Sequence, residues 1–154
     1  MESYPSFPIF IDLSARKIVV VGAGKIAARR IAALAEFAPK VTVIAPEIDP
    51  SLLPLEQAGR LEILRRGFLP ADLDGADMVL AATDDKALNA AIGESCRARG
   101  ILVNVSSDRS RSDSYFPGIA RKDNVVVGIT ASGSDHGLAR RVTEKLREVL
   151  REIL

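Results

Sequence analysis

The sequence predicts an α/β protein, with a Rossmann-like, doubly wound parallel sheet followed by a small C-terminal α+β region. Three observations support this prediction. Short apolar runs alternate with helical patterns over most of the chain, two glycines join the first run to the first helix, and the pattern changes near residue 112. Strands that alternate with helices imply parallel βαβ units. We therefore expect one domain over 1–112 and a second region over 113–154.

The first domain contains five strand candidates and two helix candidates. The expected strands are 17–21, 41–45, 61–66, 77–83 and 101–106, and the expected helices are 24–37 and 85–99. Pro39 and Gly100 end these two helices, because proline cannot continue a helix and glycine readily takes the left-handed conformation after one. The polar stretch 107–114 is expected to be a loop.

The second region combines two short strand candidates with one amphipathic helix. The strand candidates lie within 115–133, on either side of a Lys-Asp-Asn turn. The helix is expected over 138–154, and five apolar residues form one stripe along it: Leu138, Val142, Leu146, Leu150 and Ile153. Such a stripe must be covered by another surface.

Composition restricts the class of partner. The chain of 154 residues has a formal net charge of +1, so it has no overall field to attract nucleic acid or a membrane. No segment approaches the roughly 20 apolar residues of a membrane span, and the first ten residues lack the features of a signal peptide. Cys96 is the only cysteine, which excludes an intrachain disulfide. We expect a cytoplasmic protein that binds neither nucleic acid nor membranes.

The two glycines of the first strand–helix junction indicate phosphate binding. Gly22 and Gly24 follow a strand and begin a helix, and Ala27 takes the third position of the G-x-G-x-x-A pattern. The first glycine permits a tight turn, and the second lets the backbone approach a pyrophosphate at the positive end of the helix. The alternative is a plain tight turn in some other α/β protein.

Polar residues after the second and fourth strands add to the nucleotide pattern. Glu47 stands where an acid would bind a ribose 2′-hydroxyl. The end of the second strand has no Arg or Lys to bind a 2′-phosphate, so NAD is expected rather than NADP. The alternative is a solvated glutamate beside Pro46. Thr83 and Asp84 are placed to line the cofactor crevice, and either could instead cap the following helix; both roles are compatible.

The order and spacing of these segments resemble those of the precorrin-2 dehydrogenases, including the N-terminal part of siroheme synthases. The resemblance runs through "YPSFPIFIDLSARKIVVVGAGKIAARR", "VTVIAPE", "AATDD", "ILVNVSSD" and "ASGSDHGLARRVTEKL". It implies oxidation of precorrin-2 to sirohydrochlorin with NAD, and in some members insertion of Fe²⁺. It further implies NAD held at Gly22, Gly24, Lys25 and Ile26, with contacts near Pro46 and Glu47 and with Thr83 and Asn104 beside the nicotinamide.

The sequence departs from the family pattern at two places. Some members of the family carry an aspartate implicated in catalysis shortly after the fifth strand; Ser107 stands at that position here and Asp108 follows it. Either the acid has moved by one residue or Ser107 is used, and both are catalytic candidates. The turn before the last helix also differs, since Asp135 and His136 replace the usual Ser-Pro.

The expected substrate carries eight carboxylates and therefore needs cations. Arg109 and Arg111, in the loop after the fifth strand, are the preferred substrate-binding candidates, because guanidinium groups suit carboxylates. Arg140 and Arg141 are more readily explained as a solvated helix face. No metal site is predicted, because His136 is a lone histidine without other ligands at suitable spacing.

The last helix and its apolar stripe predict a homodimer, which agrees with the resemblance, because a symmetric dimer is the commonest way to cover such a face. The alternative is packing on its own domain. Two other functions stay open: an NAD-sensing regulatory module, which would not need the arginines of 107–122, and a truncated relative that binds NAD and a tetrapyrrole without turnover.

Overall fold

The computed structural model describes residues 4–133 and 135–154. The chain divides into two compact units. One unit is Ile11–Ser114, and the other combines the described residues before Ile11 with Tyr115–Leu154.

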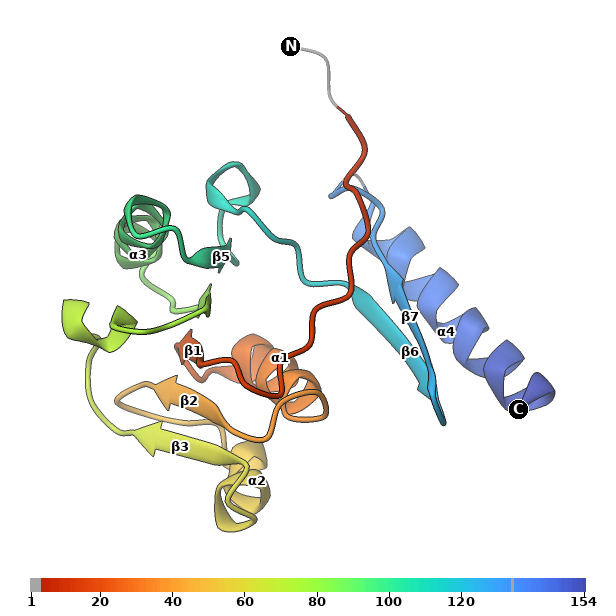
Figure 1. The fold of residues 1–154 in the computed structure, drawn as a ribbon, viewed down its shortest axis with the longest axis horizontal. Coiled ribbons are helices and arrows are strands. Elements are labelled where there is room, and N and C mark those ends of the chain that lie inside the picture. Colours follow the sequence, from red (N-terminus) through yellow and green to blue (C-terminus); the bar gives the residue numbers. More distant parts are fainter. Residues whose placement is uncertain (1–3, 134) are drawn as a thin grey trace. The chain divides into compact units, whose positions relative to one another are not determined.

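The larger unit is built on a five-stranded parallel sheet (Figure 1). Its strands are β1 (Ile18–Val21), β2 (Val41–Ile44), β3 (Leu61–Leu64), β4 (Met78–Ala81) and β5 (Leu102–Val105), in the spatial order β3-β2-β1-β4-β5. This is the strand order of a Rossmann-type fold, in which ligands bind beyond the carboxyl ends of the strands. The predicted fold class is confirmed.

The two long helices of this unit lie on opposite faces of the sheet. Figure 1 shows α1 (Lys25–Leu34) on one side and α3 (Lys86–Ala98) on the other. The sheet is therefore doubly wound, as predicted. Because helices cover both faces, β1, β2, β4 and β5 are largely buried on both sides, whereas the edge strand β3 has an exposed Glu62.

Helix α1 is shorter than its expected range, 24–37. It ends at Leu34, and turns follow it. Pro39 disfavours the helical conformation at the residue before it, and the guanidinium of Arg60 donates hydrogen bonds to the carbonyl oxygens of Ala35 and Ala38. Those carbonyls would otherwise be unsatisfied at the end of the helix.

Short helices that the sequence analysis did not predict occupy three connections. They are η1 (Pro50–Leu52) with α2 (Leu53–Gln57), η2 (Pro70–Leu73), and η3 (Arg109–Arg111) inside the expected loop. Asp49 caps η1 by accepting a hydrogen bond from the Ser51 amide at 2.9 Å. The Asp-Pro pair at the start of η1 was the available signal, because aspartate caps helices and proline suits their first turn.

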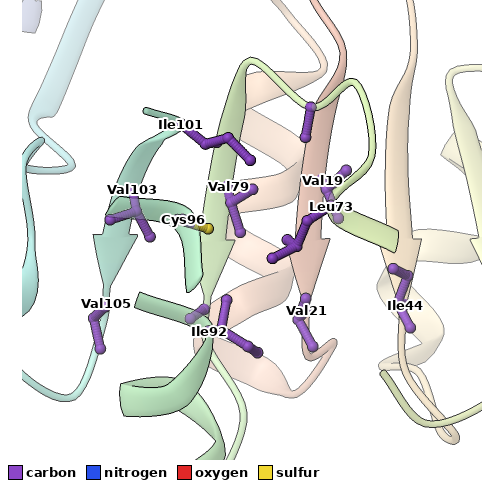
Figure 2. Close-up of a cluster of buried hydrophobic side chains, with 12 residues drawn as sticks. Val19, Val21, Ile44, Leu73, Val79, Ile92, Cys96, Ile101, Val103 and Val105 are labelled. Atoms are coloured by element: carbon purple, nitrogen blue, oxygen red, sulfur yellow. The ribbon is translucent and has the colours of Figure 1, made fainter. Parts of the chain in front are cut away.

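Apolar side chains between the sheet and α3 form the core that fixes the strand ends. Figure 2 shows Val79 and Val103 from the strands facing Ile92 and Cys96 of α3. All four are 0% exposed. Burial raises the pKa of the Cys96 thiol to about 11. A buried isoleucine such as Ile92 stabilises the fold by about 2–5 kcal/mol relative to alanine.

The smaller unit contains a hairpin and one helix. Strands β6 (Gly118–Lys122) and β7 (Val125–Ile129) pair antiparallel, and the expected turn between them contains Asp123 at a φ of 50°. Helix α4 (His136–Ile153) packs against β6. A Cβ on Gly118 would lie 2.2 Å from Thr143 Oγ1, so this glycine is what permits the close approach of helix and strand.

The predicted apolar stripe of α4 is not buried as one face within this unit. Leu150 is 7% exposed, whereas Leu138, Val142 and Ile153 are 44%, 38% and 71% exposed. The helix contacts Gly118 of the hairpin through Thr143, and Thr143 and Leu150 are its buried residues. In the described part of the chain, no helix is both long enough and apolar enough to cross a membrane.

Candidate functional site

The turn between β1 and α1 brings the backbone close to the end of β4. Gly22 has a φ of +104°, and a Cβ there would lie 2.3 Å from the carbonyl oxygen of Ala82. The Gly22 amide donates to the carbonyl of Ile44 at 2.9 Å, and the Ala82 amide donates to that of Val21 at 2.8 Å. Only glycine fits this conformation and this contact. The turn is therefore fixed by the ends of β2 and β4 on either side.

The N-terminus of α1 differs from those of the other two long helices. Asp85 caps α3 and Asp135 caps α4, each through a side-chain oxygen that accepts an amide hydrogen bond. Helix α1 begins after Gly24, has no side-chain cap and has no acid in its first turn. Its first amide groups and the positive end of its dipole thus suit an anion. A Cβ on Gly24 would meet no atom within 4 Å, so the space beside it is open.

The residues predicted to hold the cofactor at this end lie around that turn. Lys25 and Ile26 are exposed at the start of α1, and Ile26 is 68% exposed. Pro46 and Glu47 are exposed just after β2. The Asp49 amide donates to the carbonyl of Ala23 at 2.8 Å, which ties the segment after β2 to the glycine turn.

The segment after β4 is held by one buried amide that the sequence analysis missed. Asn89 of α3 is 0% exposed, and its Oδ1 accepts hydrogen bonds from the Thr83 amide at 3.0 Å and the Thr83 hydroxyl at 2.7 Å. Its Nδ2 donates to the Thr83 carbonyl at 2.9 Å. The available signal was a polar residue on the helix face that Ile92 and Cys96 bury.

The alternative role of Thr83 or Asp84, as the cap of α3, is wrong. Asp85 is the cap, and its side chain accepts from the Leu88 amide at 3.0 Å. The Thr83 hydroxyl instead turns back towards Asn89. A cap must lie immediately before the first helical residue, and Lys86 is that residue.

The two catalytic candidates after β5 have different surroundings. Ser107 Oγ accepts a hydrogen bond from Asn89 Nδ2 at 3.3 Å. The Asp108 carboxylate accepts from the Ser110 hydroxyl at 2.6 Å and the Ser110 amide at 2.9 Å, and from Arg111 Nε at 3.2 Å. The hydrogen bonds from Ser110, followed by the charge of Arg111, hold the pKa of Asp108 below its usual value. Asp108 is therefore ionised and a weak base near neutral pH.

The two predicted substrate arginines lie on η3, directly after Asp108. Arg111 is bridged between Asp108 and Glu94, whose Oε1 lies 2.6 Å from its Nη1. Arg109 is exposed. Arg97 of α3 binds the same loop through Asp113 at 3.3 Å and the Ser110 carbonyl at 3.1 Å. These contacts fasten the loop to α3.

Asn104 lies inside β5 rather than beyond its end. Its side chain donates to the Ser114 carbonyl at 2.8 Å and accepts from Arg30 Nη1 at 3.1 Å. It is 7% exposed. Burial lowers the pKa of Arg30, a half-buried residue of α1 that the sequence analysis did not identify as polar core. The Asn104 side chain is thus bonded to Arg30 and Ser114 rather than to Thr83 or Ser107.

The described residues contain no group of three or more His, Cys, Asp or Glu side chains that could hold a metal ion. His136 is exposed at the start of α4, and Cys96 is buried within α3. Of the altered turn before α4, Ser134 lies outside the described residues.

The fold and this site define a class of protein: a Rossmann-type domain whose uncapped helix end and glycine turn are suited to a dinucleotide pyrophosphate. The chain belongs to the family described as "Putative NAD(P)-binding", whose model matches residues 9–118. This membership confirms the predicted class of cofactor, a nicotinamide dinucleotide.

Comparison with individual proteins confirms the resemblance noted in the sequence. The chain is 40% identical to siroheme synthase 1 of Cronobacter sakazakii and 41% identical to siroheme synthase of Sodalis glossinidius, over 143 residues in each case. Each match covers 93% of this chain and 30% of the relative, so the chain spans less than a third of these curated relatives. A solved structure of SirC, precorrin-2 dehydrogenase, is similar with a TM-score of 0.75 and 27% identity, over 94% of this chain and 71% of that one.

Proposed function

We propose that this protein is an NAD-dependent precorrin-2 dehydrogenase that produces sirohydrochlorin in siroheme biosynthesis. The observation that carries the proposal is the uncapped N-terminus of α1 beside Gly22, in a chain that resembles siroheme synthases over 93% of its length. NAD would supply the hydride acceptor at C4 of the nicotinamide. The protein must then align the substrate with that acceptor and exclude water.

Most of the proposed cofactor residues lie just beyond the carboxyl ends of the strands. Gly22 and Gly24, with the amides of Lys25 and Ile26, would bind the pyrophosphate. The segment at Pro46 and Glu47 would bind the adenosine ribose, and its acid favours NAD over NADP. On the nicotinamide side, Thr83 would form a wall by van der Waals contact, because its amide, carbonyl and hydroxyl are all hydrogen-bonded to Asn89. Asn104, bonded to Arg30 and Ser114, would support this wall from within β5.

We propose different roles for the two catalytic candidates. Ser107 is the residue that would contact the substrate, because its hydroxyl stands at the end of β5 beside the segment after β4. Asp108 would act through its negative charge and by shaping the η3 turn, because three hydrogen bonds and a lowered pKa make it a poor proton acceptor. Turnover measured separately with Ser107→Ala and Asp108→Ala tests the assignment, and unchanged rates for both would refute it.

We propose that Arg109 and Arg111 recognise substrate carboxylates. Arg111 would do so by exchanging the carboxylate of Glu94 for a carboxylate of the substrate. A surface ion pair such as Arg111–Glu94 contributes only about 0–1 kcal/mol. Arg109→Ala and Arg111→Ala should therefore raise KM for the tetrapyrrole more than they lower kcat. Glu94→Gln is the matched control, since it removes the charge of one of the two carboxylates that bind Arg111 and should lower KM or leave it unchanged.

We also propose a cytoplasmic homodimer. The apolar side chains of Leu138, Val142 and Ile153 are exposed on α4, and a second copy of the chain is the partner that would cover them. Val142→Asp should shift the mass measured by light scattering towards that of a monomer. Lys145→Asp, on the same helix but outside the apolar stripe, is the control and should leave the mass unchanged.

The test of the whole proposal is anaerobic turnover of precorrin-2 with NAD, with NADP in a parallel reaction. Equal formation of NADH and sirohydrochlorin would support the dehydrogenase, and Fe²⁺ insertion would be tested next on the product. Tight NAD binding without product would refute the dehydrogenase and favour an NAD-sensing module or a non-catalytic tetrapyrrole-binding relative.

A further inference from the structure

Asn89 is a fully buried polar residue that belongs to none of the sequence motifs described above. Its side chain is 0% exposed on the first turns of α3, among residues that otherwise pack in the core. The Thr83 amide can only donate, so the atom 3.0 Å from it must be Oδ1, and the atom 2.9 Å from the Thr83 carbonyl must be Nδ2. The orientation of this amide is therefore fixed by its partners.

The hydrogen-bonding capacity of this amide is fully used. Oδ1 accepts two hydrogen bonds, both from Thr83, and Nδ2 donates one to the Thr83 carbonyl and one to Ser107 Oγ at 3.3 Å. An amide has two acceptor positions and two donor hydrogens, so none is left. One side chain thus connects the segments that follow two neighbouring strands, β4 and β5.

Thr83 connects Asn89 with the glycine turn. The position of a Cβ on Gly22 lies 2.9 Å from the Thr83 nitrogen and 2.3 Å from the oxygen of the preceding carbonyl, that of Ala82. A change in the Asn89 side chain would move this backbone, and the backbone forms one wall of the turn. Dinucleotide binding should therefore depend on Asn89, although Asn89 itself is buried.

Ser107 connects Asn89 with the proposed substrate position. Nδ2 is a donor only, so Ser107 Oγ accepts from it and cannot pass its own hydrogen back. The Ser107 hydroxyl hydrogen is then directed away from Asn89 and is available to an oxygen acceptor. Carboxylate or carbonyl oxygens of a bound ligand have this chemistry.

We propose that Asn89 is a positioning residue, which orients the Ser107 hydroxyl as a hydrogen-bond donor to a carboxylate or carbonyl oxygen of the ligand and holds the Thr83 backbone against the dinucleotide. The part of this inference that concerns Ser107 and the substrate rests on the proposed function. The part that concerns Thr83 and the dinucleotide can be tested without turnover.

A double-mutant cycle in the whole chain tests whether Asn89 acts on the substrate through Ser107. Ser107→Ala should lower kcat about tenfold, as expected for a hydrogen bond to a charged group, and should lower the unfolding temperature by only a few degrees, because one Asn89 hydrogen loses its partner. Asn89→Ala should lower kcat by a similar factor, and the double variant should lose no more than Asn89→Ala alone. Losses that multiply in the double variant, or an unchanged kcat in Asn89→Ala, would overturn the proposal. Failure of the parent protein to turn over would instead refute the proposed function.

A second measurement leaves position 89 unchanged, so it holds even if Asn89→Ala does not fold. In nitrogen-15 NMR spectra, the Asn89 side-chain amide resonance should shift on addition of NAD and again in Ser107→Ala. Ser106→Ala is the matched control, because Ser106 Oγ donates to the Ala81 carbonyl at 2.9 Å and has no bond to Asn89. An Asn89 resonance that NAD and Ser107→Ala both leave unchanged would overturn the inference, whatever the catalytic activity.

Discussion

Gly22 and Gly24 belong to one turn, yet the structure assigns them different roles, and alanine at each position should separate these roles. Gly22 has a φ of +104° and closely approaches the backbone of Ala82. Gly24 has a φ of −70°, which alanine adopts readily, and a Cβ there would meet no atom within 4 Å. We expect Gly22→Ala to damage the fold and Gly24→Ala to damage cofactor binding.

The expected cost of Gly22→Ala has two parts. Placing an L side chain in a left-handed conformation costs about 1–2 kcal/mol. The new Cβ would lie 2.3 Å from the Ala82 carbonyl oxygen, which is backbone and is anchored by the hydrogen bond from Ala82 to Val21. Relieving such an overlap costs about a further 1–3 kcal/mol. The total, about 2–5 kcal/mol, should lower the unfolding temperature of a chain this size by roughly 10 °C.

Gly24→Ala should leave the free energy of unfolding within about 1 kcal/mol of the parent value. Alanine is a poorer N-cap than glycine, but it also restricts the unfolded chain, and these effects oppose each other. NAD affinity should fall at least about tenfold, because the methyl group would fill the space through which the backbone meets the pyrophosphate.

Thermal unfolding followed by circular dichroism and NAD titration followed by calorimetry separate the two outcomes. Gly22→Ala with an unfolding temperature within about 2 °C of the parent would refute the strain argument. Gly24→Ala with unchanged NAD affinity would refute the placement of the pyrophosphate at this helix end.

Three further predictions concern groups whose partners the structure identifies. Arg65, which follows β3, donates two hydrogen bonds to the Glu56 carboxylate, from Nη1 at 2.8 Å and from Nη2 at 2.7 Å. Glu56→Gln should free Arg65 for a 2′-phosphate and raise NADP affinity relative to NAD severalfold. Adding Arg65→Gln to the same protein should abolish this change. The buried Cys96 thiol, with a pKa raised to about 11, should react with a thiol reagent at pH 8 only when the protein unfolds, and rapid labelling of the native protein would contradict this. Arg66 lowers the pKa of Asp72, so the pair stabilises the fold above the carboxyl pKa of the unfolded chain, about 4, and this contribution is lost as the pH falls further. Asp72→Asn should therefore make the unfolding temperature less sensitive to acid. An unchanged pH dependence would argue against the pair.

The sequence by itself determined the fold class and the place of the phosphate-binding turn. Both depend on local patterns: apolar strands of four or five residues, helices with one apolar face, and glycines at a strand–helix junction. Gly22 could be assigned in this way because its need for a positive φ is a property of the turn. Asp85 was missed as the cap because capping depends on the exact first residue of the helix, which patterns locate only approximately.

Only the tertiary structure decided which polar groups are occupied and which are available. Asn89 and Ser107 are far apart in the sequence but meet because β4 and β5 are neighbours in the sheet. Asp108 reads as a candidate base, yet Ser110 and Arg111 lower its pKa. The sequence pattern of α4 predicts one covered apolar face. The helix nevertheless contacts Gly118 through Thr143, and part of its apolar stripe is exposed. Hydrogen bonding and burial depend on which distant segments meet, and no local pattern contains that information.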